Sequence, residues 1–493
     1  MINFSIYDWV VLGLYLAFLI FIGVKVGVGQ KNVKDYFLGS KSLPWWVIGV
    51  SIIATETSAL TFIGVPAMSF AKGGNLSFVQ ILIGYVLARI IIAFFMVPQY
   101  FKGEVFSPYT LLKERFGNSP LILTSLFFLI SGSLAAGVRV YVTAIPLQSL
   151  LNIKIFYSIL IFIVIAIIYT FNGGIKSVIW TDFLQFFIFV LGGIFALIYI
   201  PIKLHSIGVS GIIEEAASAG KFHWFNSSFS FAPPFNIWMG LFGATIGVVY
   251  ALGVDQLLAQ KILSCKNKRD GQKALMLSAA IIFPLFLIFL FVGIALFIYY
   301  KHVNIKIPIP LTDGGQPKYD YVFPIFILTE TPVVFKGLLI SGIFSAALSS
   351  ISGALSALSS IWTIQFYKRF LKKEASPEFY LKYSRKIIVV FGGILVFVAF
   401  LSQNVSLVFN LAFTLTGLTS GAMLGAVVFA LLKLDFKSSE IISGMALSFI
   451  VMAIIIFLNQ IGKISIFWPW YTLIGYIIMA IGTYLHKFFL RKT

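Results

Sequence analysis

Glu56 stands inside an apolar stretch, in the run ATETSALTFIG at residues 54–64. An ionised carboxylate at mid-membrane costs roughly 2.5–3.5 kcal/mol on insertion scales. The neighbouring hydroxyls and backbone carbonyls could serve a ligand if the helix unwinds here, because unwound backbone at membrane depth lines an enclosed or wet cavity. The alternative is a Ser/Thr-rich packing face in which Glu56 pairs with an arginine.

A second group of oxygen-bearing side chains lies in ISGIFSAALSSISGALSALSS, residues 340–360. Its serines recur every three or four residues, which predicts that they share one face of a helix. Hydroxyl oxygens beside exposed carbonyls suit a hard monovalent cation, which needs oxygen ligands and no fixed geometry. Packing of small residues between helices is the alternative interpretation.

Two aspartates also stand in apolar segments. Asp182 lies about two turns into a helix that follows the Gly-Gly pair of NGGIKSVIWTDFLQ, residues 172–185. Asp255 and Gln256 follow a glycine-interrupted segment. An aspartate at membrane depth indicates an ion or proton pathway, or a capping network at the interface. Glycine-broken helices in corresponding places of two halves point to a transporter site, with glycine-lined packing as the alternative.

Arg89 and Arg139 are the basic residues that we place within apolar spans. Either could bind a substrate carboxylate through two parallel hydrogen bonds. Either could equally neutralise Glu56 or Asp182. We favour a structural role for Arg89, and both roles stay open for Arg139.

The composition excludes a soluble chain. Of 493 residues, 59% are hydrophobic and only 11% are charged, whereas soluble domains average about 25% charged residues. We therefore predict an all-α polytopic membrane protein, with residues 1–493 forming a single membrane domain. Apolar runs long enough to span predict about thirteen helices, at 7–28, 44–71, 77–101, 119–150, 153–171, 175–202, 236–262, 273–300, 334–366, 384–403, 405–432, 439–458 and 466–485.

The distribution of basic residues predicts the orientation. Most of the 36 lysines and arginines fall into the inside loops if the N-terminus is outside and the C-terminus inside. The net charge of +19 is then mainly cytoplasmic loop charge, and no nucleic-acid partner is expected. The lipid bilayer is the expected environment. The four histidines lie in loops or near span ends, and no catalytic motif is present, so an enzyme is not predicted.

At this point the residues resemble those of the sodium/solute symporters, whose members carry sugars, proline, sialic acid, pantothenate and monocarboxylates. The matching stretches occur in family order and are VKDYFLGSKSLPWW, ATETSALTFIGVP, YTLLKERFG, YTFNGGIKSVIWTDFLQ, DQLLAQKIL and FSAALSSISGALSALSS. The resemblance implies the leucine-transporter-like fold, with a leading helix at 7–28, ten core helices in two inverted repeats at 44–432, and two additional helices at 439–485.

The resemblance also implies sodium-driven symport of a small organic solute by alternating access. Sodium would be the coupling ion, and no protein partner would be required. The expected location is the cell membrane of a bacterium, as a multi-pass protein. A sodium- or proton-conducting channel and a non-transporting sensor of the same fold are the alternatives.

Carried over by position, the main sodium site would use the carbonyls of Ala54, Thr57 and Ala346 and the hydroxyls of Ser349 and Ser350. The resemblance implies a second sodium near Asp182 and Ser352 in some relatives. Gly353 replaces one of its serines here, so the sodium-to-solute ratio stays open.

The substrate residues that we expect, partly from the resemblance and partly from charge, are Glu56, Ser58, Thr61, Arg139, Asp255 and Gln256. No single substrate class of the family is matched at all of these positions. A sugar, a sialic acid, an amino acid or a carboxylate is expected as the solute.

Overall fold

The computed structural model describes residues 4–27, 30–57, 59–102, 106–151, 153–305, 307–311, 315, 317–402 and 408–490. Within these ranges every regular element is a helix. The principal helices are α1 (Ile6–Val26), α2 (Val33–Leu38), α3 (Trp45–Glu56), α4 (Ala59–Phe70), α5 (Val79–Ile91), η2 (Ile92–Met96), α6 (Val97–Tyr100), α7 (Thr110–Phe116), α8 (Asn118–Leu151), α9 (Ile155–Lys203), α10 (Gly208–Ser218), η3 (Met239–Ala244), α11 (Thr245–Val248), η4 (Val249–Val254), α12 (Gln256–Leu263), α13 (Lys268–His302), α14 (Val322–Glu330), α15 (Phe335–Ile361), η6 (Trp362–Leu371), α16 (Pro377–Leu401), α17 (Val408–Leu431), α18 (Ser438–Gln460) and α19 (Tyr471–Leu490).

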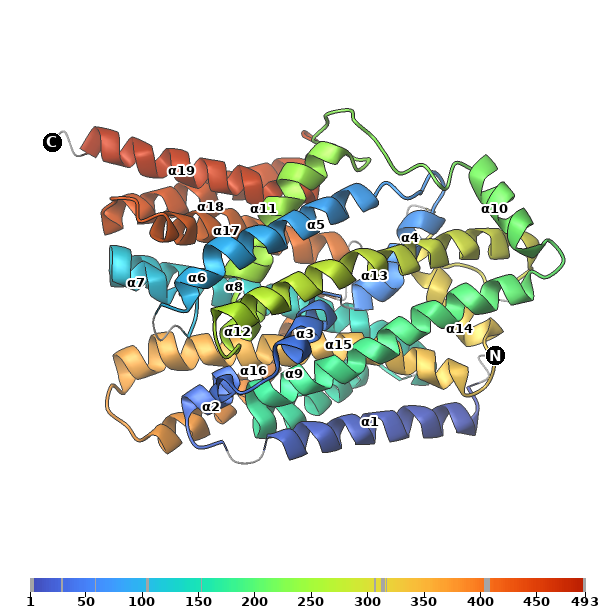
Figure 1. Cartoon of the computed structure of the whole chain (residues 1–493), viewed down its shortest axis with the longest axis horizontal. Helices are drawn as coiled ribbons and strands as arrows, with labels where there is room; N and C mark the ends of the chain where they lie inside the picture. Colours follow the sequence, from blue (N-terminus) through green and yellow to red (C-terminus); the bar gives the residue numbers. More distant parts are fainter. Residues whose placement is uncertain are drawn as a thin grey trace.

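The long helices lie side by side in one bundle, roughly along its longest axis (Figure 1). Among the described residues, nine helices are long and apolar enough to cross a membrane. The number is eleven if two bent pairs each count as one span, namely Val33–Lys41 with Trp45–Glu56 and Met239–Val254 with Gln256–Leu263. Each of the predicted spans overlaps a helix. Helix α1 begins at one end of the bundle and α19 ends at the other (Figure 1), as an odd number of crossings requires. Which end faces the cytoplasm and the boundaries of the two repeats stay predictions.

The fifth and sixth predicted spans are joined without a loop in α9. Gly174 has φ 54° and ψ −149°, which interrupts the helical backbone between them. A Cβ on Gly174 would lie 2.5 Å from the carbonyl oxygen of Tyr36, so only glycine fits both the conformation and the space.

Two spans are broken in mid-course, as the sequence predicts. Helix α3 ends at Glu56 and α4 begins at Ala59, with Thr57 in a non-helical conformation (φ −84°, ψ 85°). The π-helical turn η4 ends before Asp255, and α12 leaves it at a bend of 59°. Asp255 is extended (φ −65°, ψ 125°), and its carboxylate caps α12 by accepting a hydrogen bond from the Leu257 N–H.

Helix α15 is the serine-rich helix and lies against both broken spans. Gly353 marks the contact, because a Cβ there would lie 2.8 Å from Leu257 of α12 and 3.6 Å from Thr55 of α3. The small residues therefore do serve close packing. The same packing brings the serine face of α15 to the end of α3.

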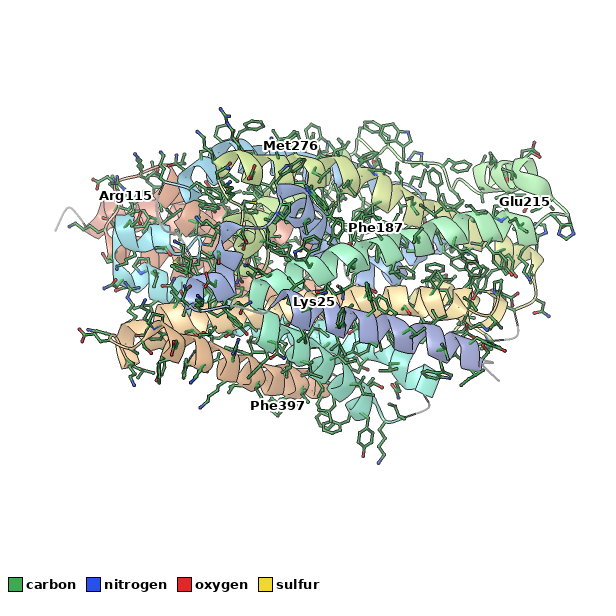
Figure 2. All side chains as sticks on the ribbon, turned by 60° about the horizontal axis from the view of Figure 1, so that its bottom comes forward. Lys25, Arg115, Phe187, Glu215, Met276 and Phe397 are labelled. Carbon is green, nitrogen blue, oxygen red and sulfur yellow. The ribbon has the colours of Figure 1, made fainter. Side chains whose placement is uncertain are left out.

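The surface of the bundle is consistent with a bilayer environment. Figure 2 shows Arg115 and Glu215 towards opposite ends of the molecule, with Phe187 and Phe397 on helices between them. Phe187 and Phe397 are 46% and 63% exposed, which is expected where the surrounding medium is hydrocarbon rather than water.

Candidate solute and cation site

A cavity of about 230 Å³ lies beside the two helix breaks. Four of the predicted substrate residues line it, three of them in different helices and the fourth at a helix break: Glu56, Thr61, Arg139 and Asp255. The bending of two spans at one level of the bundle is what brings them together. The predicted residue Ser58 lies outside the described residues.

Glu56 forms an ion pair with Arg89, whose guanidinium is fully buried. Arg89 is held further by a 3.0 Å hydrogen bond from Nε to Ser278 Oγ and a 2.8 Å bond from Nη1 to the Tyr85 carbonyl. The structural role expected of Arg89 is therefore confirmed. The Glu56 side chain remains 13% exposed and lines the cavity, so the pair forms part of the cavity wall.

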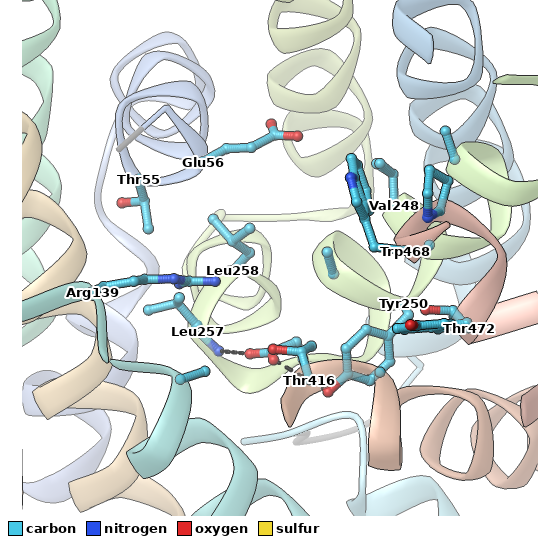
Figure 3. A pocket seen from close by; sticks show the side chains of 18 of the residues that line it. Thr55, Glu56, Arg139, Val248, Tyr250, Leu257, Leu258, Thr416, Trp468 and Thr472 are labelled. Atoms are coloured by element: carbon cyan, nitrogen blue, oxygen red, sulfur yellow. Dashed lines mark hydrogen bonds between the residues drawn. The ribbon is translucent and has the colours of Figure 1, made fainter. Parts of the chain in front are cut away.

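Arg139 is the other cation of the cavity wall. Figure 3 shows its side chain extending into the cavity close to Leu257 and Leu258. Within the part of the chain that the structure describes, Arg139 makes no ion pair and no hydrogen bond. It therefore does not neutralise Glu56 or Asp182. Asp255, which lines the same cavity, is close enough to interact with Arg139 electrostatically, and the hydrogen-bond donors of the guanidinium remain available to a solute anion.

Asp255 and its neighbour Gln256 have different surroundings. Asp255 lines the cavity and accepts a 3.3 Å hydrogen bond from the Tyr250 hydroxyl. Gln256 is fully buried, and its amide donates to the Phe106 carbonyl at 3.0 Å and to Ser360 Oγ at 3.2 Å. Gln256 does not line the cavity, and its place in the solute site stays a prediction.

Asp182 pairs with Lys261, and not with Arg89 or Arg139, which the sequence left open as partners. Lys261 lies near the end of α12, six residues after Asp255. The sequence analysis did not consider it as a partner of Asp182. The bend at Asp255 carries α12 back towards α3 and α9. Both members of the pair are fully buried.

The residues expected to bind the main sodium lie on α3 and α15. Ala54 is in the last turn of α3, whose final carbonyls lack the usual helical donors because the helix stops. Ala346, Ser349 and Ser350 lie within one turn of α15. The two helices touch here, since Thr55 Oγ1 and Ser349 Oγ are 3.2 Å apart. Thr57 Oγ1 donates to the Ile53 carbonyl at 2.7 Å, so its own hydroxyl is used locally.

Sequence reasoning missed part of the cavity wall. Thr416 of α17, Thr472 of α19 and Trp468 also line the cavity, and the sequence analysis named no candidate residue in this part of the chain. Nothing in the local sequence distinguishes these residues from ordinary polar or aromatic residues near span ends.

Comparisons with known proteins show the family to which the chain belongs. The sequence model of the sodium:solute symporter family matches residues 36–461. The sodium/sialic acid symporter SiaT of Proteus mirabilis is 28% identical over 460 residues, which cover 91% of this chain and 89% of that protein. The sodium/sialic acid symporter NanT of Aliivibrio fischeri is 26% identical over 490 residues, covering 98% and 93%.

Solved structures show the same likeness. A substrate-bound, outward-open Na⁺-coupled sialic acid symporter superimposes with a TM-score of 0.85 at 27% identity, covering 98% of both chains. Mhp1, a nucleobase-cation-symport-1 family transporter in a closed conformation, gives 0.56 at 13% identity, covering 92% of this chain and 94% of its own, and shows the fold alone.

Proposed function

Because this chain belongs to the sodium:solute symporter family, we propose that its Arg139 binds the carboxylate of a small organic solute. The chain is a multi-pass membrane protein that couples solute transport to sodium, and it is not an enzyme. The proposal concerns which solute the cavity accepts. We propose the plasma membrane of a bacterium as its location.

The observation that carries the proposal is the Arg139 guanidinium in the cavity wall. The other cation near the cavity, Arg89, already has Glu56 as its partner. A planar guanidinium can bind a carboxylate through two parallel hydrogen bonds, and each charged hydrogen bond contributes about 1.5–3 kcal/mol.

The rest of the wall supports a hydroxylated carboxylate. Hydroxyl side chains line the cavity, among them Thr61, Ser131 and Thr416, and so do aromatic side chains such as Phe78 and Phe286. Hydroxyls can bond to solute hydroxyls, and apolar rings can cover the less polar face of a sugar ring. Two relatives are named for sialic acid, which carries both a carboxylate and hydroxyl groups, so a sialic acid is the solute that we propose first.

We further propose that the coupling sodium binds at the end of α3 and the facing turn of α15. Its ligands would be the carbonyls of Ala54, Thr57 and Ala346 and the hydroxyls of Ser349 and Ser350. An ion there would hold the broken α3–α4 span against α15 and shape the cavity. By linkage, solute binding must raise sodium affinity by the factor by which sodium raises solute affinity. Alternating access of the site to the two sides of the membrane would follow from movement of the two repeats around it.

The test is uptake into proteoliposomes under a sodium gradient, with N-acetylneuraminic acid, its methyl ester and glucose as solutes. We expect uptake of the acid only, because the ester lacks the anionic charge. Arg139→Gln should lower apparent affinity for the acid by about 10- to 100-fold. Arg115→Gln, at one end of the bundle, is the matched control and should transport normally.

Two outcomes separate the parts of the proposal. Uptake of pyruvate or lactate but not of N-acetylneuraminic acid would retain the carboxylate and reject sialic acid. Equal uptake of the acid and its ester, or an unchanged affinity in Arg139→Gln, would reject Arg139 as the carboxylate site.

A further inference from the structure

A fully buried ammonium group lies where three helices meet. Lys261 of α12 extends between α3 and α9, and its side chain has no exposed area. Lys261 does not line the solute cavity, so solute binding gives this lysine no role. A buried lysine retains its charge only where oxygen ligands replace its hydration shell.

The oxygens around Lys261 Nζ form such a shell. Nζ donates to Ser51 Oγ at 2.8 Å and to the Ser51 carbonyl at 3.0 Å. It also contacts Thr55 Oγ1 and Asp182 Oδ2. Four oxygens from two helices, one of them a carboxylate oxygen, converge on a single positive charge. This is the ligand set by which proteins hold hard monovalent cations.

The site contains more acceptor capacity than the lysine uses. The second carboxylate oxygen, Asp182 Oδ1, is buried and has no hydrogen-bond partner among the described residues. An ammonium can donate only through its three protons, whereas an alkali cation can be approached by oxygens from any side. The unpartnered oxygen therefore points to a site that a metal cation could fill once the ammonium is gone.

The ammonium lies next to the proposed sodium site. Thr55, which contacts Lys261 through Oγ1, is also 3.2 Å from Ser349 of α15. A fixed positive charge this close to the proposed coupling ion disfavours another mobile cation between them, because like charges repel. The same charge holds α12, the second half of a broken span, to α3 and α9.

From this geometry we propose that the Lys261 ammonium occupies a second cation site and takes the place of a sodium ion there. The chain then binds one sodium ion, at the α3–α15 site, and removal of the ammonium converts the Ser51–Thr55–Asp182 site into a sodium site. This inference rests on the sodium site proposed above and is independent of the carboxylate proposal. No solute is needed to test it.

The experiment is equilibrium binding of ²²Na⁺ to the purified full-length protein without any solute. We expect one sodium per chain in the wild type, two in Lys261→Ala and one again in Lys261→Ala/Asp182→Ala. Ser350→Ala should bind none, which reports on the α3–α15 site separately. Lys203→Ala, at the far end of α9, is the control for loss of a lysine and should keep one sodium.

Two results would overturn the proposal. One is a wild-type protein that binds two sodium ions, and the other is a monodisperse Lys261→Ala that still binds one. If Lys261→Ala does not fold, the wild-type stoichiometry decides by itself, and the double variant supplies the control because it buries no unpaired carboxylate. A wild type that binds no sodium would reject the α3–α15 site as well.

Discussion

The Glu56 carboxylate is paired with the buried guanidinium of Arg89, which ties α5 to the last residue of α3. Arg89 is also fixed to Ser278 of α13, so the end of α3 is anchored from two sides. The helix break thus begins at a residue held in place by an ion pair. The ion pair therefore gives Glu56 a structural role in the cavity wall, whether or not Glu56 also contacts the solute.

Breaking this pair should destabilise the protein. Glu56→Gln or Arg89→Met leaves one buried charge unpaired, and removal of one partner of a buried pair costs about 3–5 kcal/mol. The double variant Glu56→Gln/Arg89→Met should recover part of that loss. Thermal unfolding in detergent, followed by size-exclusion chromatography, measures it. A Glu56→Gln protein with wild-type stability but weaker solute affinity would instead make Glu56 a ligand.

Ser350→Ala should strongly weaken sodium-driven uptake, because a hydroxyl ligand of the proposed main site is removed. The measurement is initial uptake rate against sodium concentration. Ser341→Ala is the matched control on the same helix, since the Ser341 hydroxyl bonds to the carbonyl of Gly337 one turn earlier. Unchanged sodium dependence in Ser350→Ala would remove Ser350 from the site.

Asp255 should have separable structural and electrostatic roles. Asp255→Ala removes the cap of α12 and should lower the free energy of unfolding by about 1 kcal/mol, whereas Asp255→Asn retains an acceptor oxygen. Loss of the negative charge in Asp255→Asn should lower the KM for an anionic solute, because two like charges in one cavity repel. A raised KM in a stable Asp255→Asn protein would contradict this and indicate a direct solute contact.

The ion pairs of Glu215 predict an acid-sensitive tether between α10 and α13. Hydrogen bonds from Lys301 and His302, both 2.7 Å long, hold the pKa of Glu215 below its usual value. A lowered pKa in the folded state contributes stability above the unfolded pKa of about 4.3. That contribution disappears as the pH falls through the folded pKa.

We therefore expect Glu215→Gln to lower the Tm relative to wild type at pH 7, and the difference to vanish in acid below about pH 4. Salt should reduce the difference, because the pair is near the surface. Glu214→Gln, which changes a neighbouring exposed carboxylate, should leave the Tm unchanged. A Tm difference that persists in acid would show that the effect of Glu215→Gln is not electrostatic.

Much of the architecture could be predicted from local sequence. Apolar runs predicted the spans, because hydrocarbon accepts only segments whose backbone groups bond within the helix. The hydroxyl and glycine residues around Thr57 and Gly253 predicted the two breaks, which the structure confirms. Family motifs supplied the sodium coupling.

Pairing between helices could not be predicted in this way. The sequence alone determined that Glu56 and Asp182 need a compensating charge or a wet surrounding, because an isolated carboxylate is costly at that depth. Only the tertiary structure decided that Glu56 meets Arg89 and Asp182 meets Lys261, leaving Arg139 for the cavity. The reason is geometric: a 59° bend at Asp255 redirects α12, and no local pattern encodes where a bent helix places its last turn.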